Sequence, residues 1–176
     1  MNLPNKLSLL RMGLIPVVMA LLLPVDPVCT RIAAVVYGIA AFTDFLDGYI
    51  ARKQHIVTDF GKFIDPVADK LLNLSALIML SHQGLLPAWA VVVILARELL
   101  VDGLRMVAVG QGRVIAAGKL GKIKTVSQIV LILWLMLSLQ PAAQPVSLAL
   151  IAWVIVITLW SGADYLWKNR DCIRNA

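Results

Sequence analysis

Four aspartates lie close together in one stretch of the chain, residues 44–69. Asp44 and Asp47 are three positions apart, and Asp65 and Asp69 are four positions apart. On helices, either spacing places both carboxylates on one face. Long apolar segments flank the stretch, and a carboxylate at membrane depth is costly unless a cation lies beside it. Carboxylate oxygens are the ligands of hard divalent cations, so the pattern predicts a membrane-surface site for Mg²⁺, with Mn²⁺ or Ca²⁺ as alternatives.

The composition of the whole chain is typical of a membrane protein. Of its 176 residues, 60% are hydrophobic and only 15% are charged, and the mean hydropathy is +0.86. A soluble domain of this length cannot bury that much apolar surface. The formal net charge is +6. With apolar segments this long, the excess charge favours anionic lipid or a phosphorylated substrate as partner, and we expect no nucleic acid.

The apolar residues fall into six segments, each near the length of about 20 residues that a bilayer requires. Breaks rich in proline and short connections separate them, which predicts antiparallel neighbours in one bundle. The expected fold is all-α, a six-transmembrane-helix bundle that forms a single domain over residues 1–176 and begins with an interfacial helix segment. The six expected spans are Leu9–Leu23, Arg31–Ile50, Phe63–Leu80, Pro87–Val109, Ile123–Leu139 and Val146–Trp167.

Basic residues lie almost entirely on one side of this predicted bundle. The loops on the opposite side contain essentially only Arg31. Lysine and arginine mark the cytoplasmic side of membrane proteins, so we expect both termini and the four aspartates at the cytoplasmic face of the cell (inner) membrane. The basic residues on that side are Lys6, Arg11, Arg52, Lys53, Lys62, Arg113, Lys119, Lys122, Lys124, Lys168, Arg170 and Arg174.

The residues between the aspartates form a longer pattern that is far more specific than the aspartates alone. It resembles the complete signature of the CDP-alcohol phosphatidyltransferase family, whose architecture of six spans agrees with the segments above. The pattern in this chain is Asp44-x₂-Asp47-Gly48-x₂-Ala51-Arg52-x₈-Gly61-x₃-Asp65-x₃-Asp69.

The resemblance implies a transfer reaction in which two divalent cations, usually Mg²⁺ or Mn²⁺, hold the diphosphate of a CDP-linked lipid. It implies that Asp44 and Asp65 bridge both ions, that Asp47 completes one ion and that Asp69 completes the other. Asp69 is also implied as the catalytic base, which takes the proton of the acceptor hydroxyl. The hydroxyl oxygen then attacks the lipid-side phosphorus, and CMP leaves.

The same resemblance implies which residues bind the CDP-lipid. Gly48, Arg52 and Thr58 match positions that contact the CDP group. The opening Asn5-x₂-Ser8 resembles the Asn-x₂-Thr of the family, which also contacts the nucleotide, and serine keeps the hydroxyl. Members are commonly homodimers, so a homodimer is the expected assembly.

Basic residues further along the chain bear on the acceptor alcohol. Arg97 and Arg105 are eight positions apart, which is a rise of about 12 Å on a helix, and share a broad face. Such groups can recognise a dianionic phosphate. A structural Arg97–Glu98 pair and anchoring lysines are the alternatives. The stretches ARELLVDGLR and AAGKLGKIKT resemble family members whose acceptor is glycerol 3-phosphate. This resemblance implies that Arg97, Arg105 and Lys122 hold the acceptor phosphate, with CDP-diacylglycerol as donor.

Three other functions fit part of the pattern. Within the family, inositol phosphate or another alcohol, including a lipid, can be the acceptor. An intramembrane prenyltransferase also combines aspartate-rich motifs with Mg²⁺, but it is normally longer and lacks the Gly-x₂-Ala-Arg connection. A small transporter or metal channel could use carboxylates as an ion path, although its ion site would more usually lie near the membrane midplane.

Overall fold

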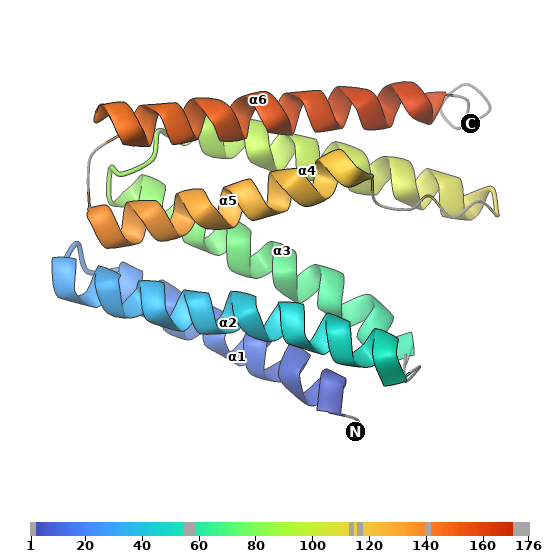
Figure 1. Ribbon diagram of the computed structural model, residues 1–176, viewed down its shortest axis with the longest axis horizontal. Coiled ribbons are helices and arrows are strands. Elements are labelled where there is room, and N and C mark those ends of the chain that lie inside the picture. Colours follow the sequence, from blue (N-terminus) through green and yellow to red (C-terminus); the bar gives the residue numbers. More distant parts are fainter. Residues whose placement is uncertain (1–2, 55–58, 113–114, 116–117, 140–141, 171–176) are drawn as a thin grey trace. The chain divides into compact units, whose positions relative to one another are not determined.

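The computed structural model describes residues 3–54, 59–112, 115, 118–139 and 142–170, with side chains left out for residues 3–7 and 44–66. The all-α prediction is confirmed for these residues, which form six helices and no strand (Figure 1). Each helix overlaps one of the six expected spans. The helices are α1 (Leu3–Leu22), α2 (Pro27–Gln54), α3 (Asp59–His82), α4 (Ala88–Gly110), α5 (Lys119–Ser138) and α6 (Pro145–Lys168).

The helices belong to two compact units. Unit 1 contains α1, α2, α3 and the end of α5, and unit 2 contains α4, the first part of α5 and α6. In residue numbers, unit 1 covers 1–86 and 132–141, and unit 2 covers 87–131 and 142–176. The expected single domain over the whole chain stays a prediction.

Two helices, α5 and α6, are long and apolar enough to cross a membrane by length and composition. Shorter apolar segments occupy residues 8–22 of α1 and 27–43 of α2. Large apolar side chains are exposed on helices of both units, for example Val35, Val92 and Trp160. Apolar surface on this scale indicates a membrane-associated protein. The six helices are therefore confirmed, whereas six membrane crossings stay a prediction.

Local sequence explains where several helices begin and end. Helix α2 begins at Pro27, the residue type favoured at a first helical position, and the carboxylate of Asp26 accepts a hydrogen bond from the Cys29 backbone N–H at 2.8 Å. This hydrogen bond lowers the pKa of Asp26. Helix α3 ends in a Schellman motif, in which Gly84 adopts a positive φ of 75° and the Leu85 N–H bonds the Leu80 carbonyl.

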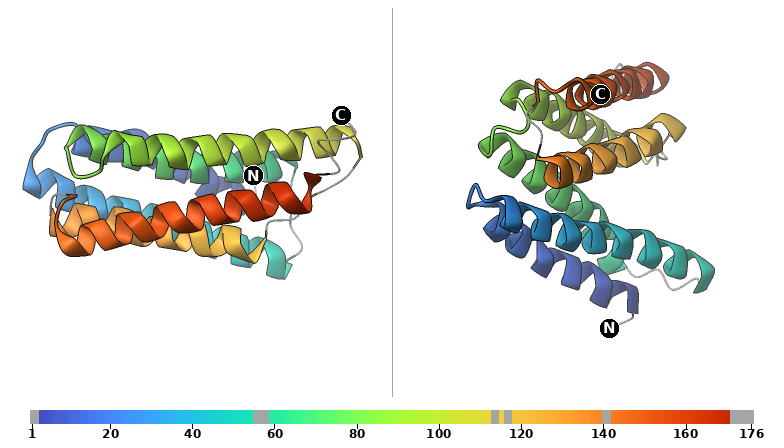
Figure 2. Two further views of the ribbon diagram at one scale, coloured as in Figure 1. Left: turned by 90° about the horizontal axis from the view of Figure 1, so that it is seen from above. Right: turned by 60° about the vertical axis from the view of Figure 1, so that its left-hand side comes forward.

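Unit 1 is organised around α1, which packs against both α2 and α3. Figures 1 and 2 both show α1 and α2 side by side with opposed chain directions. At the end of unit 1 where α1 leads into α2, Gln83, the residue that follows α3, connects the three helices. Its amide donates to the Leu22 carbonyl at 2.8 Å and to the Thr30 hydroxyl at 3.1 Å. These bonds fix the ends of α1 and α2 against α3.

Unit 2 is held by packing between α4 and α6. One cluster of its buried core contains Val101, Leu104, Ala108 and Tyr165. The indole N–H of Trp153 on α6 donates to the hydroxyl of Ser127 on α5 at 2.9 Å. Helix α6 is therefore connected to both other helices of the unit.

Candidate active site

The four aspartates occupy matching levels on α2 and α3. Only four residues connect the end of α2 at Gln54 to the start of α3 at Asp59, so the two helices run in opposite directions (Figure 1). Asp44 lies ten residues before the end of α2 and Asp69 lies ten residues after the start of α3. At 1.5 Å per residue, each is about 15 Å along its helix from the connection.

The other two aspartates form a second level. Asp47 is seven residues before the end of α2 and Asp65 is six residues after the start of α3, which corresponds to about 9–11 Å. The backbone positions of the four aspartates therefore form two levels on the opposed helices α2 and α3.

The convergence of all four carboxylates involves side chains that lie outside the described residues. The side chains of residues 44–66, among them Asp44, Asp47 and Asp65, are not described. Among the side chains that are described, no group of three or more His, Cys, Asp or Glu residues lies close enough to hold a metal ion. The predicted metal site therefore stays a prediction.

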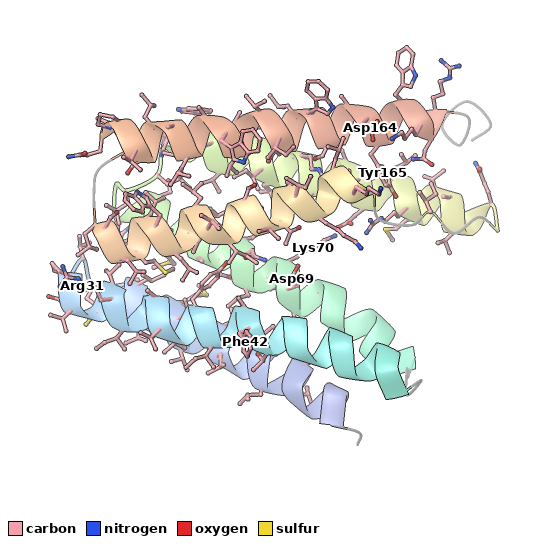
Figure 3. The ribbon with its side chains drawn as sticks, in the orientation of Figure 1. Arg31, Phe42, Asp69, Lys70, Asp164 and Tyr165 are labelled. Atoms are coloured by element: carbon pink, nitrogen blue, oxygen red, sulfur yellow. The ribbon has the colours of Figure 1, made fainter. Side chains whose placement is uncertain are left out.

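Asp69 is the one member of the set whose surroundings the structure describes (Figure 3). The side-chain amide of Asn73, one turn further along α3, donates to Asp69 Oδ1 at 3.0 Å and to the Asp69 backbone oxygen at 2.9 Å. The hydroxyl of Tyr37 on α2 donates to Asn73 Oδ1. Tyr37 and Asn73 are both buried. Because the side-chain oxygen of Asn73 accepts the hydrogen bond from Tyr37, the NH₂ group of Asn73 is directed to the carboxylate of Asp69.

This arrangement fits a metal-binding carboxylate. Carboxylates that bind metals are usually held by a further hydrogen bond, which fixes their orientation. A carboxylate has about four lone-pair positions, so the bond from Asn73 does not exhaust the capacity of Asp69. Tyr37 and Asn73 were not predicted from the sequence. The available signal in the sequence was an asparagine among apolar residues, four positions after Asp69.

Helix α1 contributes two buried polar residues to unit 1. Ser8, predicted to contact the nucleotide, and Arg11 are each 0% exposed. They are three positions apart and so lie on one face of α1. Arg11 was expected only as one of the basic residues that mark the cytoplasmic side, and the structure instead buries it completely. A buried guanidinium requires an anionic counterpart, and α2 and α3, against which α1 packs, contain the four aspartates.

The other residues expected to bind the CDP-lipid are described only in part. Asn5 lies on α1, and Gly48 and Arg52 lie on the final turns of α2, but their side chains are outside the described residues. Thr58 lies outside the described residues altogether. Their expected contacts with the nucleotide stay predictions.

In unit 2, Arg97 belongs to a buried group of charged side chains. Glu98 Oε1 accepts from Arg97 Nη1 at 3.1 Å and from Lys124 Nζ at 2.5 Å. The side chains of Arg97, Glu98 and Lys124 are 12%, 11% and 5% exposed. The Arg97–Glu98 pair that the sequence allowed is thus present. Within this group, two cations share a single carboxylate.

Arg105 and Lys122 have different surroundings. Arg105 Nε donates to the Tyr165 hydroxyl on α6 at 3.0 Å, and its guanidinium carbon lies 5.6 Å from the centroid of the tyrosine ring. Figure 3 shows Tyr165 on α6. Lys122 is exposed, whereas Lys124, which was not predicted to be a site residue, is buried against Glu98. Residues two apart on a helix face different directions, so only the fold distinguishes the two lysines.

Comparison with known proteins identifies a family and several close relatives. Residues 1–160 match the model of the CDP-alcohol phosphatidyltransferase family. The chain is 45% identical over 191 residues to the CDP-diacylglycerol–glycerol-3-phosphate 3-phosphatidyltransferase of Bacillus subtilis (strain 168), covering 99% of this chain and 98% of the relative. It is 36% identical over 178 residues to the protein of the same name from Shigella flexneri, covering 96% and 95%. It is 39% identical over 168 residues to the probable phosphatidylglycerophosphate synthase of Mycobacterium tuberculosis (strain H37Rv), covering 94% and 80%.

Proposed function

Because this chain belongs to the CDP-alcohol phosphatidyltransferase family, we propose that it transfers the phosphatidyl group of CDP-diacylglycerol to sn-glycerol 3-phosphate. A hydroxyl oxygen of the acceptor forms a new bond to the lipid-side phosphorus. The bond from that phosphorus to the bridging oxygen of the diphosphate breaks. The products are phosphatidylglycerophosphate and CMP. The observation that carries the proposal is the similarity over nearly the whole chain to relatives that bear the name of this reaction.

Asp44, Asp47, Asp65 and Asp69 would hold two divalent cations, Mg²⁺ or Mn²⁺. When bound, the cations neutralise the charge of the diphosphate and of the leaving CMP. Asp69 serves in addition as the base that accepts the proton of the attacking hydroxyl. The opposed levels of the aspartates on α2 and α3 support this assignment, as does the bond from Asn73 that orients Asp69.

Asn5, Ser8, Gly48, Arg52 and Thr58 would bind the CDP group of the donor. The burial of Ser8 within unit 1 supports a role for its hydroxyl inside the protein rather than at its surface. Gly48 has no side chain, so a bulky nucleotide can approach the backbone of α2 there.

Arg97, Arg105 and Lys122 would bind the phosphate of the acceptor. Arg97 supports this most directly, because its Nε is buried and donates to no acceptor in the part of the chain that the structure describes. A buried N–H group without an acceptor is costly, and a phosphate oxygen would satisfy it. Lys122 is exposed on the first turns of α5, where a long flexible side chain can reach a ligand.

The protein would act as a homodimer in the cell membrane, with its aspartates at the cytoplasmic face. The two helices of clear membrane-crossing length and the exposed apolar side chains of the remaining helices support a membrane location. The concentration of lysine and arginine near the aspartates supports the orientation.

The deciding experiment measures CMP release by the purified protein with CDP-diacylglycerol and each of several acceptors. We expect release with glycerol 3-phosphate only when Mg²⁺ or Mn²⁺ is present, and none with glycerol or serine. Release with inositol phosphate but not with glycerol 3-phosphate would reassign the acceptor. Consumption of a prenyl diphosphate without CMP release, or ion flux into proteoliposomes that survives Asp69→Asn, would replace the proposal by a prenyltransferase or a channel.

A further inference from the structure

The side chain of Arg97 passes two glycines on neighbouring helices of unit 2. A Cβ atom added to Gly162 of α6 would lie 3.1 Å from Cγ of Arg97. A Cβ added to Gly121 of α5 would lie 3.8 Å from its Nη2. The first distance is shorter than ordinary van der Waals contact, and the second is an ordinary contact. The absence of a side chain at residue 162 therefore sets the path of the Arg97 stem.

The far end of the Arg97 side chain is held by a carboxylate that is itself anchored. Glu98 Oε1 accepts from Arg97 Nη1 and from Lys124 Nζ at the same oxygen. Lys124 belongs to α5, so the bond ties Glu98 of α4 to a second helix. All three side chains are largely buried. Arg97 is thus fixed at its stem by Gly162 and at its tip by Glu98.

These two contacts leave one edge of the guanidinium for a ligand. Nε and Nη2 direct two parallel N–H groups to the same side, which is the fork that binds two phosphate oxygens. Glu98 bonds Nη1 and so occupies the other end. Nε is buried without an acceptor among the described residues, and Nη2 faces Gly121, which has no side chain to obstruct it.

We propose that Gly162, Glu98 and Lys124 are positioning residues that hold Arg97 with its Nε–Nη2 edge directed to the phosphate of the acceptor. The inference rests on the proposed function and deepens it. A preorganised arginine loses less conformational freedom on binding than a mobile one, so the pocket favours acceptors with a phosphate that can accept both bonds. The size of residue 162 is therefore a determinant of acceptor affinity.

The test is Gly162→Ala, measured with both substrates. The added methyl group displaces Arg97, so we expect the apparent KM for glycerol 3-phosphate to rise about tenfold, with kcat and the KM for CDP-diacylglycerol changed by less than about twofold. Gly103→Ala on α4 is the matched control, since a Cβ there meets no atom within 4 Å. It should leave all three constants unchanged. An unchanged acceptor KM in Gly162→Ala, or an equal rise in both KM values, would overturn the inference.

A second measurement separates positioning from a general loss of structure. If Gly162 acts through Arg97, adding Gly162→Ala to Arg97→Ala should not raise the acceptor KM further. A full additional rise in the double variant would assign Gly162 a purely structural role. If Gly162→Ala does not accumulate as folded protein, Glu98→Gln is measured in its place. The KM for glycerol 3-phosphate should again rise more than the KM for CDP-diacylglycerol. An unchanged acceptor KM, or an equal rise in both KM values, would overturn the inference.

The outcomes also distinguish this inference from the proposed function. If the unmodified protein releases no CMP with glycerol 3-phosphate, the proposed function fails. If it does release CMP and Gly162→Ala behaves as Gly103→Ala does, only the positioning of Arg97 fails.

Discussion

The side-chain amide of Asn73 donates a hydrogen bond to Oδ1 of Asp69 over 3.0 Å. The amide oxygen of Asn73 accepts from Tyr37 on the neighbouring helix, so the direction of the amide is determined by α2 as well as by α3. Tyr37 and Asn73 are both buried in unit 1, and a buried hydrogen bond between them restricts the rotamer of the amide that donates to Asp69. Asp69 therefore has an orientation imposed by the fold before any ligand binds.

Asn73→Leu tests this orientation. Leucine has a similar volume but cannot donate to Asp69, so the carboxylate loses a bond that fixes its rotamer. We expect the concentration of Mn²⁺ needed for half-maximal activity to rise about tenfold or more, as substitutions of residues that orient metal ligands commonly cause. Titration of Mn²⁺ binding by electron paramagnetic resonance gives the affinity independently of turnover.

The control for Asn73→Leu is Gln83→Leu. Gln83 is also an amide, but it lies just beyond the C-terminal end of α3, where it bonds Leu22 and Thr30. Its loss should lower the thermal unfolding midpoint and leave Mn²⁺ affinity unchanged. Tyr37→Phe should give a smaller loss of affinity in the same direction as Asn73→Leu. Equal Mn²⁺ affinity in Asn73→Leu and the unmodified protein would show that Asn73 serves stability alone.

Asp69→Asn separates the chemical role of the carboxylate from its structural one. The asparagine oxygen can accept the same bond from Asn73, so we expect the fold to be preserved, but the proposed base and one proposed metal ligand are removed. We expect kcat for CMP release to fall at least about a hundredfold. Asp164→Asn is the control, because the ion pair of Asp164 with Lys168 is exposed to solvent and contributes little. A fall of only a few-fold in Asp69→Asn would mean that another group takes the proton.

The helices were predictable from the sequence because two independent signals agree on them. Apolar segments of bilayer length define the helix bodies, and proline or glycine marks several boundaries, such as Pro27 at the start of α2 and Gly84 after α3. Helices α2 and α3 extend beyond the expected spans, to Gln54 and from Asp59, because polar residues that end an apolar segment do not end a helix. The number of membrane crossings does not follow from the helices alone.

Sequence reasoning proposed site residues only where they belong to a spaced pattern, and the convergence of the aspartates stays a prediction. The aspartates follow from their intervals, but the burial of Arg11, Asn73 and Lys124 depends on which face of each helix meets a neighbour. Hydropathy does not determine that face for α5, in which Lys122 is exposed and Lys124 is buried. The role of Gly162 depends on a side chain sixty-five positions away in the sequence, Arg97, and has no local signal at all.

Asp26 gives a prediction for the dependence of stability on pH. Its pKa is lowered in the folded protein, chiefly by the Cys29 backbone N–H, so the ionised carboxylate is favoured by folding. The stabilisation it provides is present at neutral pH and is lost as the pH falls through the folded pKa. We therefore expect Asp26→Ala to lower the thermal unfolding midpoint at pH 7, and the difference from the unmodified protein to shrink at acidic pH. A difference that is independent of pH would assign the effect to something other than the ionised cap.

Arg105→Ala tests the second arginine of the proposed acceptor site. If Arg105 binds the acceptor phosphate, its loss should raise the apparent KM for glycerol 3-phosphate about tenfold and that for CDP-diacylglycerol much less. Tyr165→Phe removes the hydroxyl that accepts from Arg105 Nε but keeps the ring that packs in the core. It should therefore raise the acceptor KM by a smaller factor, about threefold.

Arg170→Ala is the matched control for Arg105→Ala, because Arg170 also lies against an aromatic ring, 5.3 Å from the centroid of Trp167, but just beyond the end of α6. It removes a comparable contact between an arginine and an aromatic side chain without touching the proposed site, so both KM values should stay unchanged. If Arg105→Ala raises the KM for CDP-diacylglycerol more than the KM for glycerol 3-phosphate, Arg105 would be reassigned to donor binding. The Tyr165 hydroxyl would then orient a donor-binding group instead.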